Sequence, residues 1–224
     1  DAVDEPAAPA DPVGKVACGF YWTEGTRGLG WAIDSVPTLK GGSTVGIPSP
    51  PAILMPDGRV ITPDIRDAER MQGFSPDWTR ATCEVTRASH RWKLVGNAVT
   101  VDVAEWLGWR LRAPCEAGRA VEATDMQRRG AWPRAAFNIG NGISRVSIST
   151  HPFAEPHAPL HEWLAYPGRP LSAKATKGFL ERAEVSALRF PDRFLARLRA
   201  HLRWMEREER LATRRGRRPA ELHP

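Results

Sequence analysis

Short apolar runs separated by turn residues dominate the first part of the chain. Three of them, at residues 20–22, 52–55 and 59–61, are short, mostly apolar segments typical of strands. Between the last two, Asp57-Gly58 is a strong signal for a hairpin turn. The long stretch between the first two is rich in glycine, so we expect it to form long loops on a small sheet instead of regular structure.

The pattern becomes helical after residue 61. Thr62-Pro63 followed by Asp64 predicts a helix start, and the helix is expected to run to about Met71 and to stop at Gly73. A second helix is predicted around residues 99–111. Its apolar residues recur on one stripe, formed by Val99, Val103, Trp106, Leu107 and Leu111.

The pattern weakens again in the middle of the chain. Residues 112–129 are polar and without periodicity, which predicts a linker. Residues 135–137 and 143–149 flank Asn141-Gly142, a dipeptide typical of a second hairpin. A loop rich in proline and histidine is expected over residues 152–170.

Two helices are predicted at the C-terminal end. Ser172 is expected to cap a helix that runs through Leu188. Asp192 is expected to cap another helix that reaches about Thr213. This last helix carries arginines on most of its surface and one apolar face, formed by Leu195, Leu198, Leu202 and Met205.

Composition narrows the class of protein. The chain has 224 residues, 42% of them hydrophobic, but no run approaches the roughly 18 apolar residues of a membrane helix. No segment at the start resembles a signal peptide, and the sequence opens on Asp1, so we expect the natural N-terminus to lie upstream. Three widely spaced cysteines favour neither a disulfide framework nor a zinc site, and they suit a reducing compartment.

The net charge of +6 is concentrated near the C-terminus. Between Arg189 and Arg218 there are eleven arginines against four acidic residues, so the rest of the chain is close to neutral. A basic balance permits binding to a polyanion such as DNA. A solvated charged helix face explains the same pattern equally well.

Two motifs in the chain carry a resemblance to a known protein family. The first reads Thr62-Pro63-Asp64-Ile65-Arg66-Asp67-Ala68-Glu69-Arg70-Met71-Gln72-Gly73-Phe74, and it resembles the ninth conserved motif of the DNA cytosine-5 methyltransferases. The second, about 20 residues on, resembles the tenth motif and reads Val95-Gly96-Asn97-Ala98-Val99. The first motif departs from the family pattern by two extra residues after Pro63 and by Ser75 where proline is usual.

The ninth motif is interpreted as scaffold that joins a recognition region to a catalytic domain. Asp67 and Arg70 are three residues apart on one helix face, so they are expected to pair or to brace neighbouring elements. Gln72, Gly73 and Phe74 are expected to end the helix and to direct an aromatic side chain inward.

The tenth motif combines glycine, an amide side chain and a following helix start. Such a group suits a polar small molecule, although a plain Asn N-cap explains the residues as well. The resemblance implies that the ligand is S-adenosylmethionine, with Asn97 and Ala98 lining its pocket beside Gly96 and Val99.

Residues 32–42 resemble the end of the family's target-recognition domain. There a Thr-Leu pair followed by a glycine-rich loop faces the major groove of DNA, which here corresponds to Thr38, Leu39, Gly41 and Gly42. Lys40 and Arg27 are candidates for contacts to phosphate or guanine. Turn glycines and solvated cations are the alternative interpretation.

The fold expected from the resemblance is α/β. It comprises the C-terminal part of a Rossmann-like methyltransferase and part of a small β-rich recognition domain, with a small α+β extension. The expected ranges are a disordered lead-in at 1–15, recognition domain at 16–61, methyltransferase elements at 62–112, linker at 113–130, extension at 131–213 and basic tail at 214–224.

The reaction of the family needs a cysteine thiolate that attacks C6 of cytosine and a glutamate that steadies N3. The sequence contains neither the motif that supplies this cysteine nor the motif that supplies this glutamate. Pro114-Cys115 lies after the tenth motif and is followed by Glu116, so a catalytic role is not expected for Cys115. His151, His157 and His161 are interpreted as surface loop residues instead of a metal site.

We therefore expect a chain that needs a separate N-terminal catalytic part, binds double-stranded DNA, and works at the bacterial nucleoid in the cytoplasm. Two alternatives remain open. One is a DNA-binding or regulatory protein without catalysis, and the other is an unrelated small globular protein.

Overall fold

The computed structural model describes residues 12–23, 28–42, 49–114, 123–125, 133, 135–138, 140, 142–146 and 158–214. These residues divide into two compact units, which are considered separately. The described residues of the larger unit lie within 12–105 and 158–214, and those of the smaller unit within 106–146. Residues from 158 onward therefore group with the first part of the chain.

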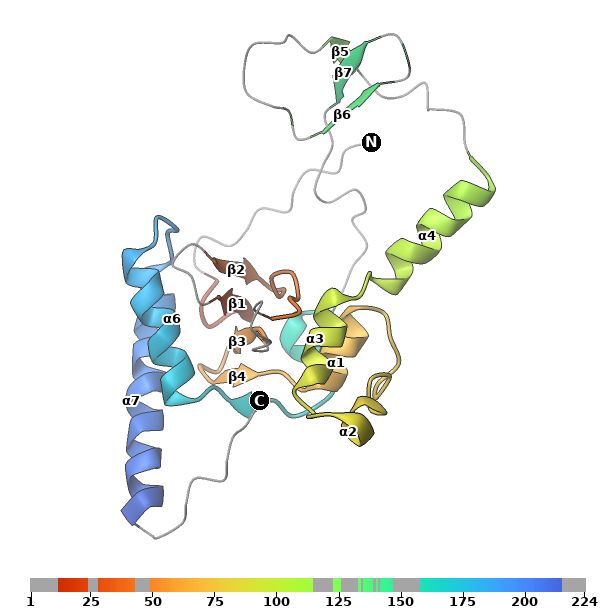
Figure 1. Ribbon diagram of the computed structural model, residues 1–224. Coiled ribbons are helices and arrows are strands. Elements are labelled where there is room, and N and C mark those ends of the chain that lie inside the picture. The colour runs from red at the N-terminus through yellow and green to blue at the C-terminus, as the bar shows by residue number, and fades with distance from the viewer. Residues whose placement is uncertain are drawn as a thin grey trace. The chain divides into compact units, whose positions relative to one another are not determined.

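A five-stranded antiparallel sheet is the centre of the larger unit (Figure 1). Its strand order is β2-β1-β3-β4-β8. The strands are β1 (Cys18–Trp22), β2 (Leu29–Ile33), β3 (Ala52–Leu54), β4 (Val60–Thr62) and β8 (Arg169–Pro170). The predicted hairpin at Asp57-Gly58 is confirmed, since Gly58 has a φ of +90° and β3 pairs with β4.

Two expectations for this sheet were wrong. The glycine-rich stretch contains β2, in which Gly30 faces Tyr21 so closely that a Cβ atom there would lie 2.3 Å from the ring. Glycine is thus required by cross-strand packing instead of marking a loop. The predicted loop at 152–170 contains β8, whose Pro170 pairs with Ile61 across more than a hundred residues.

Seven helices occur in the described residues, four of them in the segment that follows the sheet's first four strands. They are α1 (Ile65–Met71), α2 (Thr82–Val85), α3 (His90–Asn97), α4 (Val101–Arg112), α5 (Leu160–Trp163), α6 (Ala173–Val185) and α7 (Asp192–Arg214). The predicted cap of α6 is confirmed, because the Ser172 side chain accepts a hydrogen bond from the Ala175 amide. The helix predicted from Asp192 is also present.

Alternating side chains of the strands fill two separate cores. Phe20, Leu54 and Val60 face the α6–α7 pair, where Phe179 lies 4.6 Å from Phe20 between ring centroids. Ile53 and Ile61 belong to a second cluster, together with Leu160 of α5. Period-two alternation therefore gives both faces of the sheet a partner. Figure 1 shows α6 and α7 on one side of the sheet and α1 and α3 on the other.

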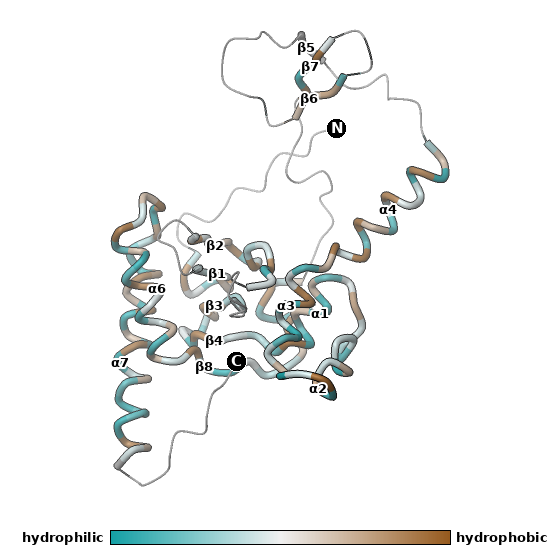
Figure 2. The backbone as a smooth tube through the Cα atoms, viewed as in Figure 1, coloured by the Kyte–Doolittle hydropathy of each residue, from teal (hydrophilic) through white to brown (hydrophobic). Residues whose placement is uncertain are grey.

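The predicted apolar stripe of α4 is exposed. Val103, Trp106 and Leu107 keep 51%, 52% and 46% of their surface accessible, so the described residues do not cover this face. Hydrophobic positions recur along the helix in Figure 2. None of the described helices combines the length and apolar character needed to cross a membrane.

The smaller unit contains a three-stranded antiparallel sheet of order β5-β7-β6. Its strands are β5 (Ala123–Asp125), β6 (Ala135–Asn138) and β7 (Ile143–Val146). The second predicted hairpin is confirmed by the β6–β7 pairing. The linker expected over 113–130 was wrong at residues 123–125, because these form β5.

His201 lies on the buried face of α7. Its Nε2 atom is 2.8 Å from the Leu171 carbonyl oxygen, and its ring lies 5.6 Å from that of Trp204. Burial lowers the pKa of His201 below its ordinary value of 6.5, and the hydrogen bond to Leu171 acts in the opposite direction. The neutral imidazole is therefore the form that the fold stabilises.

The unfolding free energy is expected to fall as the pH drops below about 6.5, because the unfolded chain then binds a proton that folded His201 resists. One such proton contributes at most about 1.4 kcal/mol per pH unit. Urea unfolding at pH 7.5 and 5.5 should show a smaller difference for His201→Gln than for the parent chain. His90→Gln is the matched control, and an equal pH dependence in the parent and H201Q proteins would contradict the role of His201.

Candidate functional site

The helix α1 carries most of the motif that resembles the ninth conserved one. Asp64 caps it, since its carboxylate accepts hydrogen bonds of 2.9 Å from both the backbone amide and the Nε of Arg66. The hydrogen bond from the Arg66 side chain lowers the pKa of Asp64. Gly73 has a φ of +82° and lies just beyond the helix end, as expected for a glycine stop.

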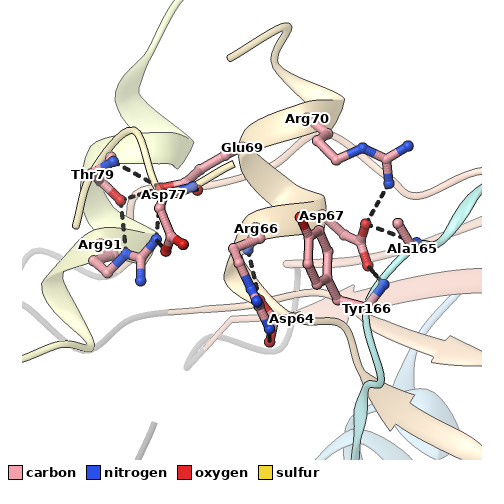
Figure 3. A network of polar contacts seen from close by, with 10 residues as sticks. All are labelled: Asp64, Arg66, Asp67, Glu69, Arg70, Asp77, Thr79, Arg91, Ala165 and Tyr166. Carbon is pink, nitrogen blue, oxygen red and sulfur yellow. Dashed lines mark hydrogen bonds and ion pairs between the residues drawn. The ribbon is translucent and has the colours of Figure 1, made fainter. Parts of the chain in front are cut away.

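Asp67 is fully buried and accepts three hydrogen bonds. The predicted pairing with Arg70 is observed at 2.6 Å, and the amides of Ala165 and Tyr166 each donate at 3.1 Å (Figure 3). The Arg70 guanidinium also donates to the carbonyl oxygen of Trp163 at 3.1 Å. The Asp67–Arg70 pair thus fastens the segment at 163–166, which lies nearly a hundred residues away in sequence.

Two arginine–aromatic stacks add to the contact between α1 and the segment at 163–166. The Arg66 guanidinium lies 3.8 Å from the centroid of the Tyr166 ring, and that of Arg70 lies 4.0 Å from the Trp163 ring. Both are cation–π geometries, in which the positive charge faces the ring's electron density. Trp163 and Tyr166 lie in the region predicted to be an irregular loop, so local sequence gave no signal for this role.

Glu69, also fully buried, organises the residues between α1 and α3. Its carboxylate accepts hydrogen bonds from the backbone amides of Asp77 and Thr79 and from the Thr79 hydroxyl. Arg91 of α3 donates to Glu69 at 3.0 Å and to Asp77 at 3.0 Å (Figure 3). Burial lowers the pKa of Arg91, but hydrogen bonds and charge attraction from Glu69 and Asp77 outweigh it and raise that pKa above its ordinary value.

Gln72 joins the two family-like motifs. Its side-chain nitrogen donates to the Val95 carbonyl oxygen at 3.0 Å, and its side-chain oxygen accepts from the Thr100 hydroxyl at 2.7 Å. Its backbone carbonyl accepts from the Val101 amide at 2.8 Å. One buried glutamine therefore fixes both the end of α3 and the start of α4.

Gly96 and Gly41 bring the tenth-motif segment into close contact with the segment at 38–42. A Cβ atom built on Gly96 would lie 2.1 Å from the carbonyl carbon of Lys40. One built on Gly41 would lie 2.0 Å from Oδ1 of Asn97. Residues 38–42 and 96–97 can therefore approach this closely only because both positions are glycine.

The helix arrangement around Asn97 differs from the prediction. Gly96 and Asn97 are the last residues of α3, and α4 begins at Val101, so Asn97 is not the N-cap of the following helix. Asn97 is exposed, its side chain lies against Gly41, and Val99 keeps 64% of its surface accessible. Gly-Asn suits a helix end, which explains the difference.

The segment at 38–42 is held mainly by packing. Leu39 contacts the small core of Ala68, Trp92 and Val95, so its side chain points into the protein. The Lys40 ammonium lies 4.4 Å from the centroid of the Tyr21 ring. Thr38 is exposed, and Gly42 has a φ of +97°. Arg27, the other candidate for a DNA contact, lies outside the described residues.

A cavity of about 290 Å³ lies between residues 74–82 and the end of α3. Phe74 and Trp78, whose rings stack at 5.6 Å, form one side of it. Leu94, Val95 and Ala98 form the other. Thr79 and Thr82 are its polar side chains, so the cavity suits a mainly apolar group.

None of the cysteine and histidine residues that the structure describes lines this cavity. Cys18 is buried, Cys83 is exposed, and Cys115, His151 and His157 lie outside the described residues. Within the ranges that the structure describes, no three His, Cys, Asp or Glu side chains are arranged to hold a metal ion.

Substitution of Gly96 by alanine is expected to force apart the contact with residues 40–41 and to lower the unfolding free energy by about 1–3 kcal/mol. Hydrogen exchange of the amides at 38–42 should become faster. Gly108→Ala is the matched control, since a Cβ there meets nothing within 4 Å and removes a helix glycine. Equal stability and exchange in the Gly96→Ala and parent proteins would refute the close approach.

Comparison with known proteins finds one informative similarity. The chain is 42% identical over 182 residues to the type II methyltransferase M2.BsuMI of Bacillus subtilis (strain 168). The alignment covers 79% of this chain and 46% of that protein, so the chain spans about half the length of the relative it matches. No protein-family model matches the sequence, and no solved structure does. The chain is therefore similar to a part of a type II methyltransferase.

Proposed function

We propose that this chain is the C-terminal portion of a DNA cytosine-5 methyltransferase. The complete enzyme transfers a methyl group from S-adenosylmethionine to C5 of cytosine in duplex DNA. The observation that carries the proposal is the similarity to the Bacillus methyltransferase, together with two family-like motifs that Gln72 joins in space. A chance pair of motifs has no reason to share a buried hydrogen-bonded residue.

The proposed role of residues 38–42 is DNA recognition. Since Leu39 packs inward, the groups available to DNA are the exposed Thr38, the Lys40 side chain and the backbone around Gly41 and Gly42. Arg27 is proposed to add a further contact to DNA. Glycines allow the backbone to approach base edges, and the packing of Leu39 holds the segment in one place.

The proposed role of residues 96–99 is to form one wall of the S-adenosylmethionine site. Ala98 lines the apolar cavity, and the Asn97 amide is exposed beside it. The carboxylate, amino and hydroxyl groups of this cofactor need more polar partners than Thr79 and Thr82, the polar side chains that line the cavity. The fit is therefore partial, and bound S-adenosylmethionine would supply the methyl group only in the complete enzyme.

The thiolate and the glutamate that act on cytosine are proposed to come from a catalytic part outside this sequence. The exposed apolar face of α4, with Val103, Trp106 and Leu107, is the proposed contact for that part. A contiguous exposed apolar surface marks an interaction site in water-soluble proteins. Such a partner also explains why an amphipathic helix leaves its apolar face uncovered.

The proposal is tested by methylation of duplex DNA with labelled S-adenosylmethionine. The chain is combined with the part of the Bacillus relative that lies outside the aligned 182 residues. We expect label in DNA only when both polypeptides are present, because neither contains a complete site.

Two variants sharpen this test. Val103→Glu/Leu107→Glu should abolish the combined activity while the chain stays folded, because both side chains are already exposed. Val85→Glu, at an apolar residue with 86% exposure on α2, is the control that should retain activity. Turnover by the chain alone contradicts the proposal. DNA binding without turnover in any combination favours a non-catalytic DNA-binding protein.

A further inference from the structure

The helix α7 carries an arginine ridge along the side opposite its buried stripe. The ridge consists of Arg199, Arg203, Arg207 and Arg210, which follow one another at steps of four, four and three residues. The buried stripe consists of Phe194, Leu198, His201 and Met205. Steps of three and four keep each set on its own face of the helix, so the four guanidinium groups share one direction.

Few carboxylates of the described residues neutralise the positive charge of this ridge. Arg199 lies 3.4 Å from Glu184 of α6 in an exposed pair, which contributes little to stability. For Arg203, Arg207 and Arg210, no carboxylate of the described residues lies within ion-pair distance. Glu206 borders the ridge, whereas Glu208 and Glu209 project to other sides of the helix.

The length of α7 is not explained by packing. The last buried residue is Met205, yet the helix continues to Arg214, and residues 206–213 are half-buried or exposed. Figure 1 shows this part of α7 running past the end of α6, its neighbour. A helical stretch without a buried face gains little from the core, so a charged partner is the simpler reason for its composition.

We infer that the arginine ridge of α7 contacts the phosphates of duplex DNA, outside the recognition segment at 38–42. At 1.5 Å per residue, Arg199 and Arg210 are about 16 Å apart along the helix. Duplex DNA presents one phosphate charge per roughly 1.7 Å of its axis, so about ten phosphates lie within that length. Guanidinium groups bind phosphate oxygens with paired hydrogen bonds. These contacts position the protein without reading sequence.

This inference rests on the proposed function in taking duplex DNA as the partner. It predicts a salt-dependent, sequence-independent part of the affinity. The logarithm of the binding constant falls with the logarithm of salt concentration by about 0.9 for each neutralised phosphate. Each ridge arginine removed should therefore make that slope shallower by about 0.9.

The experiment measures the affinity of the full chain for a labelled 30-base-pair duplex by fluorescence anisotropy, between 25 and 150 mM NaCl. Arg203→Gln/Arg207→Gln should make the slope shallower by about 1.8, equally for two duplexes of unrelated sequence. Glutamine has nearly the helix propensity of arginine, so circular dichroism should show unchanged folding. Arg80→Gln/Arg87→Gln removes the same charge from exposed residues elsewhere and should leave the slope within about 0.5 of the parent.

The outcomes separate the two claims. A parent chain that binds DNA, with a slope unchanged by R203Q/R207Q, overturns the ridge contact and leaves the proposed function standing. An equal change in the R80Q/R87Q control also overturns the ridge contact, because the effect is then one of overall charge. A parent chain that binds no DNA even at 25 mM NaCl overturns both the ridge contact and the proposed DNA recognition by residues 38–42.

Discussion

Two buried carboxylates on one short helix hold the larger unit together. Asp67 and Glu69 of α1 are both inaccessible to solvent, and a buried charge is costly unless it is paired and hydrogen-bonded. Asp67 therefore holds Arg70 and the backbone of residues 165–166, whereas Glu69 holds Arg91 and the backbone of residues 77–79. The same helix thus anchors the C-terminal segment on one side and α3 on the other, and the loss of either partner would leave an uncompensated charge in the interior.

This arrangement bears on function because α3 ends at the segment for which a cofactor role is proposed. With α3 held by Arg91 and Gln72, Gly96 and Asn97 meet Lys40 and Gly41 at backbone distance. A displacement of residues 96–97 would therefore displace residues 40–41, and the reverse. Such coupling would suit the proposed enzyme, which must bind DNA and its methyl donor together. The C-terminal helices α6 and α7 belong to the same unit, since they cover the sheet from which residues 38–42 emerge. The arginine ridge would in that case extend the proposed DNA-binding surface within the same unit.

Local signals in the sequence predicted the elements whose cause is local. The Asp64 cap, the Gly73 stop, the Asp57-Gly58 turn and the Ser172 cap all depend on residues within a few positions of one another. The failures arise from distant partners. β2 depends on Gly30 meeting Tyr21, β8 depends on Ile61, and α5 depends on the second core. The partners of Glu69 lie 8 to 22 residues away, so its pairing with Arg91 has no local signature. The sequence predicted the pairing of Asp67 with Arg70, because residues three apart lie on the same face of a helix. It did not predict that this pair holds residues 163–166.

If this chain contributes to methylation at C5 of cytosine, the chemical identity of the methylated nucleoside should reveal it. Duplex DNA that has been methylated by the chain together with the catalytic part would be digested to nucleosides and analysed by mass spectrometry. We expect 5-methylcytosine as the new nucleoside, since both motifs resemble those of the cytosine-5 family. A product that contains N4-methylcytosine or N6-methyladenine instead would contradict this expectation, even though the similarity to a type II methyltransferase would still stand.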